Sequence, residues 1–219
     1  MRGLIVVLAS LGAAPLACLA ADGEPVQAPY VEKGDCWSYR ASNFRDQGKL
    51  RDADEYEICV SFVDKANGTI LGVQTFKSDG RENDLTYTAE WGNARSGSGA
   101  TNSPPARFLR FPLHAGDSYR LEYETRNPRA ARKLQARHRW DLKVVGWEDV
   151  TVPAGTFRAL KIEGKGSYDR LDSGLRGDES VTYWYAPEVA RWVKFEQWDQ
   201  HSNGGQVSTS ELTSFRLNK

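Results

Sequence analysis

The chain has 219 residues, and its 29 Lys and Arg residues balance its 29 Asp and Glu residues, so the formal net charge is +0. This neutrality argues against a protein that binds a polyanion over its whole surface. Beyond the first 21 residues, no apolar run is long enough to span a bilayer, so we expect no membrane span in the mature chain.

The N-terminus has the layout of a secretory signal peptide. Arg2 precedes an apolar run over residues 4–11, and the small residues Ala20 and Ala21 form an expected cleavage site. We therefore expect residues 1–21 to be removed and residues 22–219 to form a single β domain in the periplasm, where nucleic acid is disfavoured as a partner. An uncleaved anchor and a lipoprotein modified at Cys18 are the weaker alternatives.

Apolar and polar residues alternate with a period of two along most of the chain, which predicts β-strands. The expected strands cover residues 36–42, 55–64, 69–77, 85–91, 107–111, 117–125, 136–145, 148–152, 156–164, 180–186, 192–198 and 206–217. Turn residues such as Asn67-Gly68 separate them. The pattern predicts an all-β fold with little helix: a single curled antiparallel sheet, either a half-barrel or an open-barrel meander, of about 10–12 strands.

Residues 93–105 are rich in Gly, Ser and Pro and show no periodicity. This composition is typical of a mobile loop or of a boundary between two half-units. A short similarity between residues 34–39 and 116–121 favours the second interpretation, because repeated segments mark duplication. Both alternatives stay open at this point.

Two cysteines, Cys36 and Cys59, remain once the signal peptide is removed. In an oxidising compartment such a pair predicts one disulfide. The expected strands 36–42 and 55–64 supply a geometry for it, because they can form a hairpin in which the two cysteines face each other. Two free thiols are the alternative.

The same hairpin register satisfies two further conditions. It places Trp37 opposite Ile58 on the inner side and Arg40 opposite Glu55 on the outer side. A shift by one residue would turn every side chain to the other face and lose both pairings. The register is therefore well specified by the sequence.

No catalytic motif, metal site or cofactor motif is apparent. The three histidines, His114, His138 and His201, share no ligand spacing, and we interpret them as surface or loop residues. The acidic loop over residues 169–179 contains arginines and matches no calcium loop, and the basic segment 126–139 is interpreted as a solvated hairpin tip. The sequence therefore predicts no catalytic residues, no metal and no cofactor.

The aromatic residues give the candidate binding site. If residues 181–186 and 191–198 pair around a turn, one face of the hairpin also carries Lys194 and Glu196. A face that combines charges with large rings is typical of a wet groove rather than of a buried layer. The predicted ligand-binding residues are the four rings of this face: Tyr183, Tyr185, Trp192 and Trp198.

The opposite face of that hairpin would carry Trp184, Val193 and Phe195. Antiparallel sheets usually have one polar face, so a second aromatic face needs another layer, a partner or a ligand to cover it. Core packing is the alternative interpretation of these rings.

Residues 150–157 (VTVPAGTF), 183–187 (YWYAP) and 111–117 carry a family resemblance. They resemble a group of uncharacterised bacterial exported β-domains, catalogued as domains of unknown function or as TapB-like. The resemblance runs from about residue 34 to the C-terminus and implies fold and compartment rather than activity. More loosely, such domains are similar to the half-barrels that carry lipoproteins across the periplasm, which is an analogy of fold.

We therefore expect an exported, non-enzymatic binding or assembly protein whose aromatic concave surface takes a hydrophobic, lipid-like ligand or an envelope protein partner. The alternatives are an envelope hydrolase with convergent carboxylates and a purely structural module. A deep apolar cavity would favour binding, and acids around a polar floor would favour hydrolysis.

Overall fold

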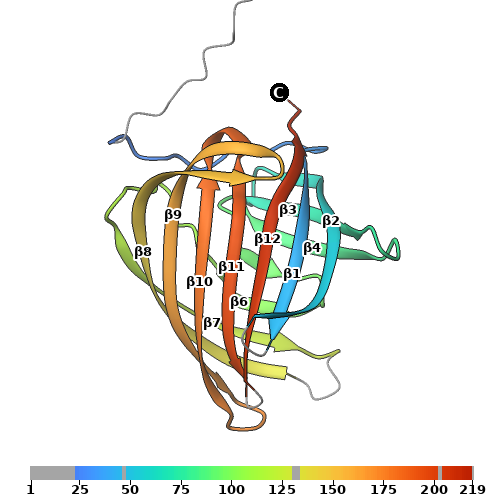
Figure 1. The fold of residues 1–219 in the computed structure, drawn as a ribbon, viewed down its shortest axis with the longest axis vertical. Helices are drawn as coiled ribbons and strands as arrows, with labels where there is room; N and C mark the ends of the chain where they lie inside the picture. Colours follow the sequence, from blue (N-terminus) through green and yellow to red (C-terminus); the bar gives the residue numbers. More distant parts are fainter. Residues whose placement is uncertain (1–22, 46–47, 130–133, 202–203, 219) are drawn as a thin grey trace, which may run out of the picture.

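A computed structural model describes residues 23–45, 48–129, 134–201 and 204–218, and the expected signal peptide lies outside these residues. The described chain is built from antiparallel strands and one short 3-10 helix, η1 (Pro187–Val189) (Figure 1). None of its helices is long and apolar enough to cross a membrane. The strands are β1 (Cys36–Arg45), β2 (Lys49–Asp64), β3 (Thr69–Phe76), β4 (Glu82–Thr88), β5 (Asn93–Arg95), β6 (Thr101–Ala106), β7 (Ser118–Asn127), β8 (Leu134–Val152), β9 (Gly155–Arg170), β10 (Arg176–Ala186), β11 (Arg191–His201) and β12 (Gly204–Arg216).

The strands form a closed barrel, so the expected half-barrel or open sheet is wrong. Each strand pairs with the next in sequence, and β1 pairs antiparallel with β12 to complete the ring. In Figure 1 these two strands lie side by side with β11 and β2. Closure satisfies the backbone N–H and C=O groups that β1 and β12 would expose at the edges of an open sheet.

Most of the expected strands are present, and many of them are longer than the pattern indicated. The separate strands expected at 136–145 and 148–152 form one strand, β8, which contains an irregularity between Val144 and Gly146. Residues 107–111 are not a strand, and residues 93–105 contain β5 and most of β6 instead of a loop. The proposed division into two half-units stays a prediction, because one barrel contains both sides of that segment.

The first hairpin has the predicted register. Cys36 pairs with Cys59, Trp37 with Ile58 and Arg40 with Glu55. The two cysteines form a disulfide, with their Cα atoms 4.2 Å apart. Trp37 is 0% exposed, whereas Arg40 lies outside and forms a 3.4 Å ion pair with Glu55. Both the inner and the outer pairings are confirmed.

The core is concentrated at the end of the barrel where β10 passes through η1 into β11. Two indole N–H groups fix this connection, since Trp37 Nε1 donates to the carbonyl of Val189 and Trp91 Nε1 donates to that of Ala190, both at 2.8 Å. Trp91 itself meets Trp37 edge to face, with ring centroids 5.4 Å apart. Buried aromatic rings therefore close this end, and the remaining interior is free to hold a cavity.

Candidate binding cavity

A cavity of about 360 Å³ lies inside the barrel. This volume falls within the range of small-molecule sites, roughly 300–1,000 Å³. Nine of the described aromatic side chains line the cavity: Tyr56, Tyr87, Trp91, Phe108, Tyr123, Trp140, Tyr183, Trp192 and Phe195. Amide and hydroxyl side chains supply the polar part of the wall, and none of the described lining residues is charged: the polar ones are Gln74, Asn93, Ser96, Asn102, Gln197 and Ser210.

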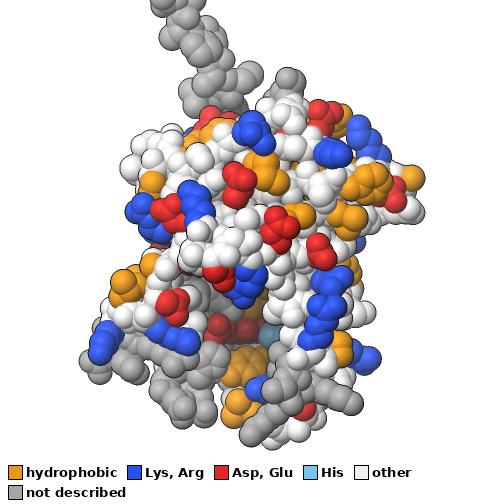
Figure 2. Space-filling model, turned by 90° about the vertical axis from the view of Figure 1, so that its right-hand side faces the viewer, with side chains coloured by type: hydrophobic (Ala, Val, Ile, Leu, Met, Phe, Trp, Pro, Cys, Tyr) orange, Lys and Arg blue, Asp and Glu red, His pale blue; other side chains and the backbone are white. Residues whose placement is uncertain are grey.

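The surface is hollowed on the side of the barrel shown in Figure 2, where hydrophobic, acidic and histidine side chains are visible in the lower half. Strand pairing along the ring is shortest around β5 and β6. Only two positions are paired between β4 and β5, and only three between β6 and β7. The barrel wall therefore has its fewest inter-strand pairs between β4 and β7.

Two of the four predicted binding residues line the cavity. Tyr183 on β10 and Trp192 on β11 form part of its wall, with ring centroids 5.7 Å apart. Phe195, which regular alternation places on the opposite face, joins them and lies 4.9 Å from Tyr183. Burial raises the pKa of the Tyr183 phenol far above its ordinary range.

A β-bulge explains the change at Phe195. Tyr185 pairs with Trp192, and the preceding Trp184 pairs with Lys194, so Val193 is an extra residue on β11. The extra residue reverses the side of the sheet to which each later side chain of β11 points. Positions 195 and 197 therefore turn inward, where a regular strand would have turned 194, 196 and 198 inward.

The side chains after the bulge that were predicted to share the face of Trp192 consequently lie on the outer side of the barrel. That prediction is therefore wrong for Lys194, Glu196 and Trp198. Lys194 pairs with Glu196 at 2.9 Å. The Trp198 ring packs directly against the backbone of Gly205, because a Cβ atom added to this glycine would lie only 2.5 Å from the ring Nε1. The charges therefore form no rim of the cavity.

Tyr185 points inward but lies in the closed core. It is 1% exposed, is absent from the cavity wall and packs edge to face on Phe111 with centroids 5.2 Å apart. The prediction of a wet aromatic groove therefore fails for this ring. Its surroundings are those of a core residue.

The interpretation of His138 as a surface or loop residue is wrong. His138 lies on β8 and its side chain is mostly buried. Its Nδ1 lies 2.9 Å from Oε1 of Glu179, with side-chain exposures of 16% and 4%. The imidazole also stacks on Tyr123, with centroids 4.7 Å apart. The alternation along β8 could have revealed this position, because His138 shares its parity with the apolar residues Trp140, Leu142 and Val144.

Two inward carboxylates, Glu179 and Asp199, face each other across β10 and β11. Each is already engaged, Glu179 by His138 and Asp199 by Nε2 of Gln197 at 2.8 Å. Burial, with the negative charges of Glu179 and Asp199, raises the pKa of the Tyr123 phenol beyond its ordinary range. Buried polar groups are here satisfied by one another.

Trp140 contributes an unsatisfied donor to the cavity wall. Its ring lies against bare backbone, since a Cβ on Gly166 would lie 2.5 Å from it. Its buried Nε1 lies close enough to the Tyr123 hydroxyl to oppose the rise in the pKa of that phenol, but makes no regular hydrogen bond among the described residues, and neither does the buried Oδ1 of Asn93. Buried polar atoms normally have partners, so Asn93 Oδ1 and Trp140 Nε1 can serve a ligand in the cavity.

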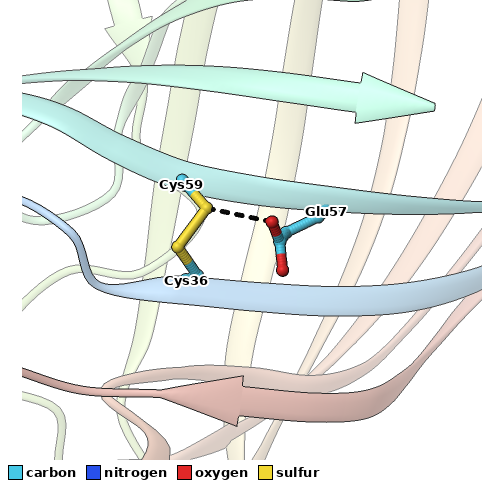
Figure 3. A group of neighbouring side chains, drawn as sticks. All are labelled: Cys36, Glu57 and Cys59. Atoms are coloured by element: carbon cyan, nitrogen blue, oxygen red, sulfur yellow. Dashed lines mark hydrogen bonds between the residues drawn. A yellow bond between two sulfur atoms is a disulfide. The ribbon is translucent and has the colours of Figure 1, made fainter. Parts of the chain in front are cut away.

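One group of metal-ligand residue types occurs in the described part of the chain: Cys36, Glu57 and Cys59 (Figure 3). A carboxylate oxygen of Glu57 lies 3.2 Å from Sγ of Cys59. Both sulfurs belong to the disulfide, so neither is a free thiolate that could bind a metal. The arrangement is structural.

The two charged segments carry ion pairs. On the basic one, Arg137 and Arg126 both pair with Glu124, at 2.9 and 3.6 Å. On the acidic one, Asp169 accepts Arg139 at 2.7 Å and Arg176 at 2.9 Å. The Arg139 guanidinium lowers the pKa of Asp169. The described residues of both segments therefore pair with opposite charges and form no surface patch of one sign.

Residues 123–212 match a sequence family described as DUF3108-like, which confirms the resemblance to an uncharacterised domain family. No curated protein is similar enough to the chain to match it. A protein described as a lipoprotein from Parabacteroides distasonis has a TM-score of 0.52 and 14% identity, covering 88% of this chain and 100% of that one. At this identity the likeness shows the fold alone.

Two further solved structures have lower TM-scores. An exported protein with a YmcC-like fold from Bacteroides fragilis has a TM-score of 0.44 and 15% identity, over 88% of this chain and 99% of that one. The hypothetical lipoprotein YmcC from Escherichia coli has a TM-score of 0.39 and 9% identity, over 81% and 84%.

Proposed function

We propose that the chain is a non-enzymatic binding protein of the periplasm, whose barrel takes up a hydrophobic, lipid-like ligand. The cavity of about 360 Å³ carries this proposal. Its aromatic lining favours an apolar chain, and its amides and hydroxyls favour a ligand that also has a polar end. The ligand is therefore an amphiphile.

The cavity itself favours binding over hydrolysis. The two inward acids that could have formed a hydrolytic pair, Glu179 and Asp199, are held by His138 and Gln197. Glu179 and Asp199 are also absent from the cavity wall. A carboxylate that accepts a fixed hydrogen bond away from the substrate site is poorly placed as general acid or base.

Export is supported by the residue pattern of positions 1–21 and by the disulfide between Cys36 and Cys59. Protein isolated from the periplasm should begin at Ala21 or Asp22 and contain no free thiol. An intact Met1 or a lipid-modified Cys18 would contradict this part of the proposal.

The test uses N-phenyl-1-naphthylamine, a neutral dye whose fluorescence rises in apolar sites. Ser210 lines the cavity, and the neighbouring Thr209 lies on the outer side of the same strand. Ser210→Phe places a ring in the cavity, whereas Thr209→Phe adds the same ring outside. We expect the wild-type protein and Thr209→Phe to bind the dye, and Ser210→Phe to bind it about tenfold more weakly or not at all.

Circular dichroism and thermal melting check that both variants fold. Dye binding that is equal in both variants would place the dye outside the cavity and overturn the proposal. A wild-type protein that does not bind the dye would also overturn it, and would favour a structural role or a protein partner.

A further inference from the structure

Arg191, the first residue of β11, is buried inside the barrel at 0% exposure. Four aromatic rings surround its guanidinium carbon: Trp192 at 4.0 Å, Trp91 at 4.2 Å, Tyr87 at 5.1 Å and Trp37 at 5.2 Å from the ring centroids. Cation–π contacts of this kind stabilise a guanidinium, but they supply no counter-charge.

The charge of Arg191 is not neutralised by the described protein. Its Nη2 donates to the hydroxyl of Tyr87 at 3.2 Å, and its guanidinium lies close enough to the hydroxyl of Tyr39 to oppose the rise in the pKa of that phenol. Its Nε and Nη1 have no other hydrogen-bond partner among the described residues. No ion pair within 4.0 Å is found for it in that part of the chain. A buried charge without a counter-ion is costly, so an anion that reached Arg191 would gain a favourable interaction.

The charge is adjacent to the cavity. Three of the four rings around it, Tyr87, Trp91 and Trp192, also line the cavity wall. Its effect extends to Tyr56 and Tyr183 on that wall, where burial raises the pKa of both phenols and the positive charge of Arg191 opposes the rise. The charge of Arg191 therefore acts on groups that line the cavity.

Tyr87 connects the charge to the cavity. Its oxygen accepts a hydrogen bond from Arg191, which leaves its own O–H proton to donate. Hydrogen bonds in a chain polarise one another, so this O–H is a stronger donor than a free phenol. A donor backed by a fixed cation suits an anionic acceptor.

We propose that the cavity binds an amphiphile by a terminal carboxylate, which accepts a hydrogen bond from the Tyr87 hydroxyl and takes Arg191 as its counter-charge. This inference rests on the proposed function and names the class of ligand. The aromatic wall holds the alkyl chain, and the carboxylate lies at the Tyr87 end of the cavity.

The experiment compares two probes of equal chain length, dodecanoate and dodecanol, as displacers of N-phenyl-1-naphthylamine at pH 8. Dodecanoate is ionised at this pH, whereas dodecanol is neutral. We expect the wild-type protein to bind dodecanoate at least about tenfold more tightly than dodecanol. Arg191→Met should remove this preference and still bind dodecanol.

Two further variants control the interpretation. Arg40→Met removes an arginine from the outer side of β1 and should leave the preference unchanged. Tyr87→Phe keeps the charge of Arg191 but removes the donor, and should reduce the preference severalfold. If Arg191→Met does not fold, Tyr87→Phe decides the question.

Equal binding of dodecanoate and dodecanol by the wild-type protein would overturn the carboxylate inference and leave the binding function in place. A preference that persists in both Arg191→Met and Tyr87→Phe would also overturn it. Failure of the dye to bind at all overturns the proposed function instead, so the two failures are distinguishable.

Discussion

Tyr185 and Trp198 carry large rings on neighbouring strands, but the two rings have different surroundings. Tyr185 is 1% exposed and packs on Phe111 inside the barrel. Trp198 lies on the outer side, against the backbone of Gly205 and opposite the exposed Val207. Ring size alone therefore does not predict how much each residue stabilises the fold.

We expect Tyr185→Ala to lower the free energy of unfolding by about 3–5 kcal/mol, because the deletion leaves a cavity in a closed core. Trp198→Ala should cost about 1 kcal/mol, since its ring is only partly buried. Urea titrations of both variants measure the difference. Equal costs would mean that Tyr185 is not in the closed core.

The buried tyrosines should make the folded protein less stable at alkaline pH. Burial raises the pKa of Tyr39 and Tyr183 above the value of about 10 that an unfolded chain has. Because the pKa of these phenols is higher in the folded than in the unfolded state, their contribution to the free energy of unfolding is complete below about pH 10 and is lost as the pH rises further. We expect the phenolate absorbance of these buried residues to appear together with unfolding, and Tyr183→Phe to make the loss less steep. Phenolate formation at these residues with circular dichroism unchanged would contradict this.

At the scale of the strand, the bulge at Val193 decides which side chains of β11 enter the barrel. It lets Trp192 and Phe195 both face inward while Lys194 stays outside in an ion pair with Glu196. Without it, a strand that kept Trp192 inside would also bury Lys194 and Glu196. The bulge therefore builds the aromatic wall of the cavity.

Deleting Val193 should leave the facing of β11 unchanged and cost about 2 kcal/mol for the loss of one buried valine side chain, because Lys194 then directly follows Trp192 and regular alternation keeps Trp192 inward and Lys194 outward. The matched control is Val193→Ala, which keeps the chain length and should cost about 2 kcal/mol. Thermal melting compares the two variants. A deletion variant several kcal/mol less stable than Val193→Ala would show that Val193 is not the extra residue of β11.

The sequence predicted the register of the first hairpin but not the facing of β11 in the hairpin that it forms with β10, and the difference is physical. Cys36 and Cys59 sit on strands whose inner and outer pairings admit only one register. At β11, Trp192 and Val193 are both apolar, so the alternation shows no break where the extra residue lies. Tyr183 and Trp192 were found by parity, and Phe195 and Arg191 were missed because a bulge and a buried cation leave no period-two signal.

At the scale of the whole molecule, closure was the feature that the residue pattern could not show. Alternation reports which face of a strand is buried, and it is the same for a strand inside a sheet and one at its edge. Closure depends on pairing between β1 and β12, which lie at opposite ends of the chain. That pairing encloses the cavity, so the binding proposal depends on it.

Closure can be tested with a pair of cysteines across β1 and β12. Ser42 and Thr209 are register partners on the outer side of the barrel, and opposed residues of antiparallel strands lie about 4.5–5.5 Å apart at Cα, within reach of a disulfide. We expect Ser42→Cys with Thr209→Cys to cross-link on mild oxidation, as read from the disulfide-linked peptides by mass spectrometry. The control pairs Ser42→Cys with Thr182→Cys, which lies in the same row but three strand spacings away, roughly 14 Å, and should not cross-link. In an open half-barrel β1 and β12 would be separate edges, so free thiols in both variants would show that the sheet does not close.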